Sequence, residues 1–294
     1  MPKILRSHLA NRSLLRLTGT DVKSFLQNLI TNDIEKLSSN SAIYSALLTP
    51  QGKFLHDFFI IEWANEIYLD CLKDRSADLI KKLSLYKLRA DVKIEDTSEG
   101  YNIFAYYSQN SAVLMEHLKI STDTNTIAYP DPRNEGLGFR VISGADISMP
   151  NADVIDADLV SYTKHRLSLG IPEGGSDIIP EKNFLLETNF EELNGVSFSK
   201  GCYVGQELTA RTKHRAKIKK RLFQFTFDGD IAINDIISSD GVEIATVCAF
   251  ESPYGLAITR LSQWEKALQT GTKLEPLGLS LDKPEYVILP PQEN

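Results

Sequence analysis

The chain has 294 residues, of which 42% are hydrophobic, and its formal net charge is −7 at pH 7. This length permits two or three domains, and the apolar fraction is that of an ordinary globular protein. The acidic balance argues against direct nucleic-acid binding by the chain as a whole, and no apolar run approaches the roughly 18 residues of a membrane span. We therefore expect neither nucleic acid nor a membrane as a partner.

The chain has three cysteines, Cys71, Cys202 and Cys248, and no C-x-x-C pair. An odd number of cysteines at wide spacing indicates a reducing compartment and no disulfide framework. Structural zinc sites and iron–sulfur clusters usually need about four protein ligands. We therefore expect no metal site that this chain holds alone.

The N-terminal segment predicts a strand followed by a helix. Residues 14–17 are typical of a short strand, and Thr20 is a candidate N-cap for a helix with one apolar face. That helix would end at Thr31-Asn32-Asp33. Asn32 would there serve either simple turn chemistry or a ligand site.

Further elements are expected as far as residue 142. The expected strands are residues 42–48, 54–63, 67–72, 92–95, 101–107 and 139–142, with a hairpin turn at residues 49–53. Asp74 would cap one helix, and residues 111–119 would form a short second helix. The order strand–helix–strand–strand–helix–strand predicts an α+β, ferredoxin-like unit rather than a parallel sheet.

The C-terminal half begins with a helix expected over residues 156–169, which Gly170-Ile171-Pro172 would stop. Residues 211–221 then contain seven Lys or Arg and no acid. This basic run is either a solvated connector or a site for a polyanion such as a polyglutamyl tail. From residue 222 onward, short strands and Asp-Gly turns predict a small β-barrel.

The stretch around Cys202 is the best candidate for chemistry. Gly201 and Gly205 bracket the cysteine and free the backbone, Lys200 lies two residues before it, and residues 206–210 could begin a helix. A nearby cation and a helix N-terminus both favour a thiolate, which is the nucleophilic and metal-binding form. The alternative is a small buried cysteine in a turn.

The octapeptide Lys200-Gly201-Cys202-Tyr203-Val204-Gly205-Gln206-Glu207 resembles the K-G-C-Y-x-G-Q-E signature of the YgfZ proteins. These are folate-binding relatives of the glycine-cleavage T-protein, an aminomethyltransferase. Other segments resemble the family in the same order along nearly the whole chain. They are Leu17-Thr18-Gly19-Thr20-Asp21, Phe25-Leu26-Gln27, Thr31-Asn32-Asp33, Leu48-Thr49-Pro50-Gln51-Gly52-Lys53, Arg166 with Gly170-Ile171-Pro172, and Glu187 upstream of Gly195-Val196-Ser197-Phe198.

The resemblance implies a three-lobed cloverleaf of two ferredoxin-like lobes and a small C-terminal β-barrel, as in the aminomethyltransferase-like fold. We expect one lobe from residues 1–45 with 153–216, which carries the Cys202 loop, a second from residues 46–152, and the barrel from residues 217–294. The lobes would surround a channel for tetrahydrofolate or a one-carbon derivative. The family acts in assembly or repair of iron–sulfur clusters, including those of radical-SAM tRNA-modifying enzymes.

Two positions differ from the T-protein pattern R-L-E-A-G-L and G-G-x-x-D-D. Ser168 replaces the glutamate that grips the pterin, which argues against aminomethyl transfer, whereas Asp57 keeps the second acid of the other motif. Such a carboxylate can hold a proton near a folate ring nitrogen, or it can simply face solvent on its strand. The sequence leaves open whether the chain is an enzyme. An aminomethyl- or methyltransferase and a folate-independent scaffold are the alternative functions.

The resemblance assigns catalytic roles to Cys202, Lys200 and Asp57. The residues expected to bind folate are Asn32, Asp57, Gly201, Tyr203, Gly205, Gln206, Glu207 and Arg211. Tyr203 could instead fill the core, and Glu207 could pair with Arg211 one helical turn away. The expected partners are folate and iron–sulfur client proteins or assembly factors. We expect a monomer in the bacterial cytoplasm, with the mitochondrial matrix as the alternative location.

Overall fold

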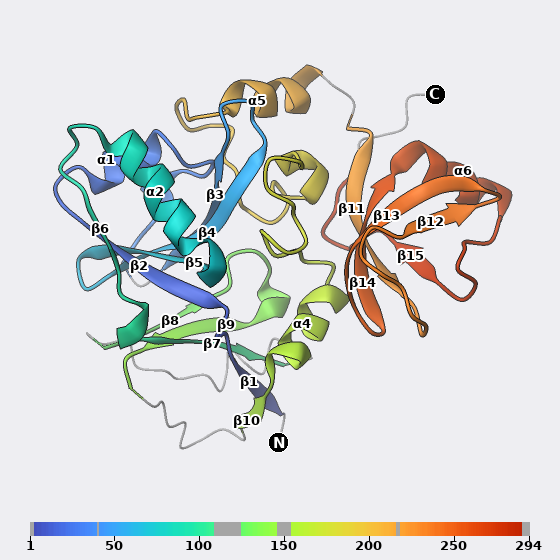
Figure 1. Cartoon of the computed structure of the whole chain (residues 1–294), viewed down its shortest axis with the longest axis horizontal. Helices are drawn as coiled ribbons and strands as arrows, with labels where there is room; N and C mark the ends of the chain where they lie inside the picture. The colour runs from blue at the N-terminus through green and yellow to red at the C-terminus, as the bar shows by residue number, and fades with distance from the viewer. Residues whose placement is uncertain (1–2, 40, 109–124, 146–153, 216–217, 290–294) are drawn as a thin grey trace.

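The computed structural model describes residues 3–39, 41–108, 125–145, 154–215 and 218–289. Within these residues the strands form three five-stranded sheets, two of them stacked on one side of the molecule and the third to the right in Figure 1. Helices are few and short. The expected α+β, three-lobed architecture is confirmed.

The first sheet joins the N-terminus to the middle of the chain, in the order β10-β1-β7-β9-β8. Its strands are β1 (Ile4–His8), β7 (Asn102–Tyr107), β8 (Thr126–Pro130), β9 (Phe139–Ser143) and β10 (Val154–Ala157). Strand β10 runs parallel to β1, and the other pairs are antiparallel. Helix α4 (Leu159–Ser168) follows β10 and is capped by Asp158, whose carboxylate accepts from the Ser161 amide.

The second sheet is built from one continuous part of the chain, in the order β3-β4-β5-β2-β6. Its strands are β2 (Arg12–Thr18), β3 (Ala42–Leu48), β4 (Phe54–Trp63), β5 (Glu66–Leu72) and β6 (Lys93–Asp96). Helices α1 (Val22–Gln27) and α2 (Ser76–Lys87) lie over one face of this sheet (Figure 1). Strand β4 is buried along nearly its whole length because both faces of the sheet are covered.

Two apolar cores explain how these layers stack. Phe25 and Leu26 of α1 and Leu79 of α2 pack with one face of the second sheet. The opposite face of that sheet contributes Phe59 to a core that also holds Tyr107 of the first sheet, together with other side chains from both. The second sheet is therefore the middle layer, and burial of these apolar side chains is the main force that holds the layers together.

The third sheet forms the C-terminal barrel, in the order β12-β13-β14-β11-β15. Its elements are β11 (Lys220–Thr226), β12 (Ile236–Ser239), β13 (Val242–Glu251), β14 (Tyr254–Arg260), helix α6 (Leu261–Thr270) and β15 (Ser280–Asp282). Leu167 of α4 packs against Leu222 and Leu256 of this sheet, so α4 joins the barrel to the first sheet.

The long connection between α4 and β11 contains little regular structure. It includes the 3-10 turn η5 (Leu185–Thr188) and helix α5 (Gln206–Arg215), which lies at the top of Figure 1. The other 3-10 turns are η1 (Ile34–Lys36), η2 (Lys73–Arg75), η3 (Ser98–Gly100) and η4 (Glu135–Leu137). Phe190 of this connection is fully buried in the core between the two sheets.

The strand pairing corrects the expected lobe boundaries. A boundary between residues 45 and 46 would cut β3, which pairs along its whole length with β4. The lobe that contains residues 4–8 instead takes β7, β8 and β9, which were expected in the other lobe. The expectation failed because a hairpin keeps β3 and β4 together, whereas the pairing of β1 with β7 spans about a hundred residues and leaves no local signal.

Three helices start differently from the sequence prediction. Residues 154–157 form strand β10, so the expected helix over residues 156–169 begins only at Leu159. Thr20 donates to Asp91 instead of capping α1, and α2 begins after η2 without a side-chain cap from Asp74. The short helix expected over residues 111–119 lies outside the described residues.

Candidate functional site

Cys202 is exposed, in an irregular segment that leads into α5. The helix begins at Gln206, whose amide donates to the Tyr203 carbonyl oxygen at 3.2 Å. The expected helix after the cysteine is therefore confirmed. Cys71 is buried and Cys248 is half-buried in a strand, and burial raises the pKa of Cys71 to about 12 and that of Cys248 to about 11. Cys202 is thus the accessible thiol among the three.

Lys200 was expected to stabilise a thiolate at Cys202, but its ammonium group is bound to a different part of the chain. Its Nζ donates to the carbonyl oxygens of Gln27, Ile30 and Asn32, each at 2.7 Å. An ammonium has three N–H donors, so all of them are used on the C-terminal end of α1 and the turn after it. Burial lowers the Lys200 pKa to about 8. The lysine anchors the Cys202 segment to α1, where a cation also complements the helix dipole.

The two glycines that bracket Cys202 differ in what they require. Gly205 has φ +80, and an added Cβ would lie 2.5 Å from the Thr49 carbonyl oxygen. It therefore lets the segment pack closely on the hairpin between β3 and β4. An added Cβ at Gly201 would meet nothing within 4 Å, so the expected need for a glycine at that position is not supported.

Tyr203 and Asn32 are buried, Tyr203 in the core and Asn32 in the turn after α1, which are the alternatives that the sequence had left open. Tyr203 belongs to the core between the sheets, with Lys200 Nζ 5.2 Å from its ring centre. Asn32 donates through Nδ2 to the carbonyl oxygens of Tyr44 and Asn194, both at 2.8 Å. Its Oδ1 accepts from the amide of the next residue. Both side chains serve the fold at this point.

The polar residues of α5 make ordinary surface pairs. Arg211 donates to Glu207 at 2.9 Å, one helical turn away, and both side chains are exposed. This is the alternative that the spacing had left open. Such an exposed pair contributes little to stability.

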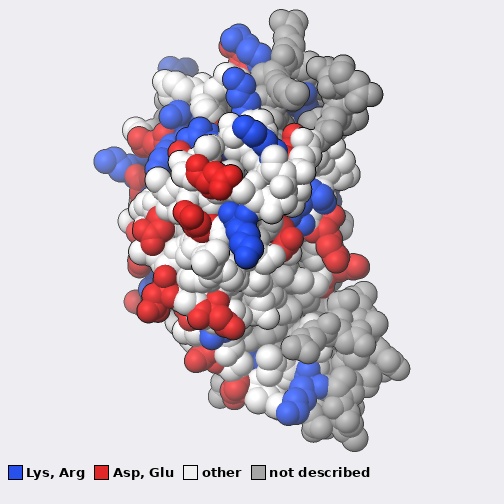
Figure 2. Space-filling model, turned by 90° about the vertical axis from the view of Figure 1, so that its right-hand side faces the viewer, with Lys and Arg blue, Asp and Glu red and all other residues white. Residues whose placement is uncertain are grey.

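Three of the seven cations in the basic run over residues 211–221 pair with acids among the described side chains, and one of these is Arg211. Lys213 pairs with Glu191, and Arg221 is buried against Glu192. On the face of the molecule shown in Figure 2, Lys and Arg lie mainly in the upper part and Asp and Glu mainly below them. These pairs favour the connector interpretation over a polyanion site.

Asp57 lies on β4 and is buried rather than solvent-facing. Its Oδ2 accepts from the Tyr44 hydroxyl at 2.8 Å and from the Gly174 amide at 3.3 Å. An added Cβ at Gly174 would lie only 2.0 Å from Asp57 Oδ1. The loop after α4 therefore covers both oxygens of this carboxylate.

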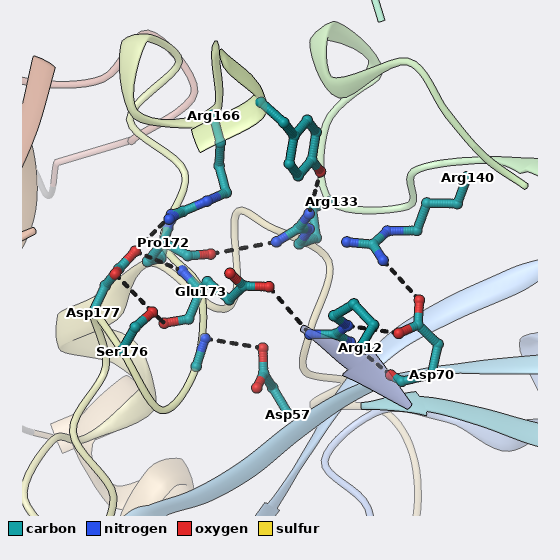
Figure 3. A network of polar contacts seen from close by, with 12 residues as sticks. Arg12, Asp57, Asp70, Arg133, Arg140, Arg166, Pro172, Glu173, Ser176 and Asp177 are labelled. Carbon is teal, nitrogen blue, oxygen red and sulfur yellow. Dashed lines mark hydrogen bonds and ion pairs between the residues drawn. The ribbon is translucent and has the colours of Figure 1, made fainter. Parts of the chain in front are cut away.

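Asp57 borders a buried network of ion pairs that joins the two stacked sheets (Figure 3). Asp70 on β5 accepts from Arg12 on β2 at 2.6 Å and from Arg140 on β9 at 2.7 Å. Asp131 pairs with Arg133 at 2.8 Å and with Arg140 at 3.2 Å. Burial alone would raise the Asp131 pKa, but the two arginines outweigh it and hold the pKa below its usual value.

The loop after α4 adds its own carboxylates to this network. Glu173 accepts from Arg12 Nη1 at 3.2 Å, and Asp177 accepts from Arg166 Nη1 at 2.6 Å (Figure 3). Arg166 is the residue that matched the family motif. Arg12, Arg140 and Glu173 were not predicted as part of a site, because single charged residues in strands and loops give no local sign that they meet.

The surroundings of Asp57 do not fit a pterin in this structure. The Asp57 carboxylate, which was expected to meet the pterin ring, instead accepts hydrogen bonds from Tyr44 and the Gly174 backbone. Glu173 of the same loop occupies the neighbouring position by its ion pair with Arg12. Ser168 donates to the His165 carbonyl oxygen within its own helix and offers no acid in place of the missing glutamate.

Comparisons with known proteins place this geometry in a family. The chain is 32% identical over 277 residues to the mouse (Mus musculus) protein named iron-sulfur cluster assembly factor IBA57, mitochondrial, which covers 86% of this chain and 76% of that protein. The human (Homo sapiens) protein of the same name is 32% identical over 271 residues, covering 85% and 76%. The chain belongs to the IBA57 family.

Other IBA57 relatives are longer than this chain. A homolog from Neurospora crassa is 36% identical over 228 residues, which is 73% of this chain and 52% of that protein. The chain thus spans about half the length of the fungal relatives that it matches. The activity and the partners of the whole IBA57 proteins are therefore a proposal for this chain.

Domain and structure comparisons agree on the IBA57 architecture. Residues 9–137 match the GCVT N-terminal domain, and residues 219–287 match the CAF17 C-terminal beta-barrel domain. The glycine cleavage system aminomethyltransferase T from Bartonella henselae aligns with TM-score 0.73 at 13% identity, covering 97% of this chain and 86% of that chain. This likeness shows the fold alone. A closer relation to YgfZ itself stays a prediction.

Two observations limit the chemistry of the described residues. They contain no group of three or more His, Cys, Asp or Glu placed to hold a metal ion. None of the helices described is both long and apolar enough to cross a bilayer. Cys202 is therefore, within the part of the chain that the structure describes, a thiol without further metal ligands grouped around it.

Proposed function

We propose that this chain acts in the assembly of iron–sulfur clusters and that Cys202 is the residue through which it meets its cargo. The observation that carries this proposal is an exposed thiol on an anchored segment, in a chain whose relatives are named as assembly factors. Thiolates are the usual ligands of iron–sulfur clusters. The cargo is thus held in part by this sulfur.

A single thiolate cannot complete the coordination of a cluster. Clusters are usually held by about four protein ligands, and the described residues group no others that could serve. The remaining ligands would come from a partner protein that carries or receives the cluster. Radical-SAM tRNA-modifying enzymes as clients remain a prediction from the family resemblance.

The test compares Cys202→Ser with Cys248→Ser, a change at a half-buried thiol on β13. In cells that lack the native protein, Cys202→Ser should lose most iron–sulfur enzyme activity, whereas Cys248→Ser should keep it. Both purified variants should retain the wild-type melting temperature within a few degrees. Full activity of Cys202→Ser would remove the thiol from the mechanism.

Aminomethyl transfer is the second function that the fold suggests, and we do not favour it. Ser168 bonds within its helix, and Asp57 is covered by the Gly174 loop. We expect no turnover in a glycine-cleavage assay with a lipoyl carrier protein. Of the two compartments that the sequence left open, we propose the mitochondrial matrix, because the relatives compared are named as mitochondrial proteins.

A further inference from the structure

The end of α2 places a leucine where the backbone normally favours glycine. Leu88 follows the last residue of α2 with φ 47 and ψ −105, and it is 88% exposed. The residue just after a helix often takes positive φ, but glycine is usual there because a Cβ is disfavoured. Neither local conformation nor burial explains a leucine at this point, and such strain is often kept where a residue has a function.

Leu88 belongs to a larger apolar area that the fold leaves open. Leu85 is 65% exposed and Tyr86 is 36% exposed on the same end of α2. Beside them lies a pocket of about 340 Å³ between α1 and α2, with Phe25 and Leu29 among its lining residues. We call the exposed side chains of Leu85, Tyr86 and Leu88, together with the buried Phe25 and Leu29 in the wall of the pocket, the Leu88 patch. Exposed patches of this kind mark interaction surfaces more often than scattered single side chains do.

The rim of the Leu88 patch carries two cations, Lys87 and Arg89, and one carboxylate, Asp21. The charge of Lys87 also helps to lower the pKa of the neighbouring Asp91 carboxylate, whereas no described acid is within ion-pair distance of Arg89. The pocket's acid, Asp21, already accepts from the backbone amide of Asp91 at 2.9 Å. Asp91 in turn accepts from Thr20. An occupant with carboxylates around an apolar side chain would therefore find apolar contact and a pocket lining in which two cations outnumber one carboxylate.

The Leu88 patch lies close to the Cys202 segment. Leu29 lines the pocket, and the next residue, Ile30, accepts a hydrogen bond from Lys200 Nζ at 2.7 Å. Along this path the Cα atoms of Leu29 and Cys202 are at most about 23 Å apart. A standard interface of about 800 Å² per partner is roughly 30 Å across, so one protein can cover both Cys202 and the pocket wall at Leu29.

We propose that the Leu88 patch docks a protein segment that presents a large apolar side chain between acidic residues. This inference rests on the proposed function in one respect: the docked segment belongs to the same partner protein that meets Cys202. A membrane surface is the less favoured occupant, because Ser24 and Asn28 also line the pocket and a bilayer would have to cover these polar side chains.

The test uses photo-crosslinking from the full chain in cells. A p-benzoylphenylalanine replaces Leu88 in one variant and Gly201, beside Cys202, in a second, because an added side chain at Gly201 has open space. Leu268, which is 61% exposed on α6 of the barrel, is the matched control position. We expect one protein to be linked from both position 88 and position 201 but not from position 268, through a segment that contains Asp or Glu.

Charge reversal then tests the rim. Lys87→Glu with Arg89→Glu should lower the yield of the position 201 adduct at least tenfold, whereas Lys266→Glu with Lys273→Glu on the barrel should leave it unchanged. The proposal would be overturned if positions 88 and 201 were linked to different proteins, or if position 88 gave a lipid adduct or no adduct. It would also be overturned if the yield of the position 201 adduct did not change with the rim charges. If Cys202→Ser proved fully active while the two adducts still named one protein, the proposed function would fail and the docking surface would stand.

Discussion

Lys200 and Cys202 lie two residues apart in one motif, yet the structure gives them different tasks. The lysine places its charge on three carbonyl oxygens at the end of α1, and the cysteine is exposed. Lys200→Met leaves those buried carbonyl oxygens without a donor. We expect a loss of about 2–4 kcal/mol in the free energy of unfolding, measured with a chemical denaturant.

Cys202→Ser is the matched comparison, because it changes an exposed atom in the same segment. Its free energy of unfolding should change by less than about 1 kcal/mol. A Lys200→Met protein as stable as the wild type would show that the three hydrogen bonds do not hold the segment. A Cys202→Ser protein that loses as much as Lys200→Met would place the sulfur in the fold rather than at its surface.

His56 gives the protein a calculable pH dependence. It is buried on β4 with Nε2 2.9 Å from an Asp78 carboxylate oxygen. Burial lowers its pKa from 6.5 to about 4, with Arg75 acting in the same direction. The unfolded chain therefore binds more protons than the folded chain between pH 4 and 6.5, and stability rises with pH across this range.

We expect this histidine to contribute about 3 kcal/mol to the loss of stability between pH 6.5 and pH 4. Denaturant unfolding at several pH values measures the slope. His56→Gln should flatten it, and His8→Gln, at an exposed histidine, should not. An unchanged slope in His56→Gln would assign the acid sensitivity to carboxylates instead.

At the scale of the elements, the loop after α4 is shaped by one close approach. Gly174 passes so near Asp57 and Phe54 that an added Cβ would lie 2.0 Å from the carboxylate and 2.6 Å from the ring. Gly174→Ala must push the loop away or move β4. We expect it to cost about 1–3 kcal/mol, as overpacking does.

Gly201→Ala is the control for Gly174→Ala, because a Cβ there meets no neighbouring atom. It should change the free energy of unfolding by less than about 0.5 kcal/mol. If thermal or denaturant unfolding found both glycines equally tolerant, the loop would be more loosely held against Asp57 than its geometry indicates.

The elements themselves were largely predictable from local patterns. Residues 42–48 and 54–63 were expected as strands joined by a hairpin, and they form β3 and β4 with those bounds. Alternation and turn residues are enough for such a pair. The expected helix over residues 156–169 wrongly includes the last two residues of β10, because that strand depends on a parallel partner at residues 4–7, which no local pattern reveals.

The candidate site was predictable only in part for the same reason. The sequence motif indicated an accessible Cys202 before a helix, and the structure has both. It left open whether Tyr203 fills the core and could not indicate that Lys200 reaches α1, since each depends on a contact with a distant segment. The arginines at positions 12 and 140 were missed because 128 positions of sequence separate two side chains that share Asp70.

At the scale of the molecule, Asp70 is the residue that ties the two stacked sheets together. Its carboxylate bonds Arg12 within the second sheet and Arg140 in the first, and all three side chains are almost fully buried. Breaking one partner of a buried pair leaves an uncompensated charge, which is far more costly than the net worth of the pair. Asp70→Asn leaves Arg12 with Glu173, and Arg140 with Asp131, as the remaining acidic partners, both at the longer distance of 3.2 Å.

We expect Asp70→Asn to lower the free energy of unfolding by about 3–5 kcal/mol. Glu207→Gln, which removes the exposed pair with Arg211, should change it by less than about 0.5 kcal/mol. Because the network spans both sheets, their unfolding should remain a single transition in the wild type. In Asp70→Asn, tryptophan fluorescence from Trp63 on β4 should separate from amide exchange of β7 and β9. Coincident transitions and unchanged stability in Asp70→Asn would mean that apolar packing alone holds the sheets together, and that the ion pairs serve another purpose.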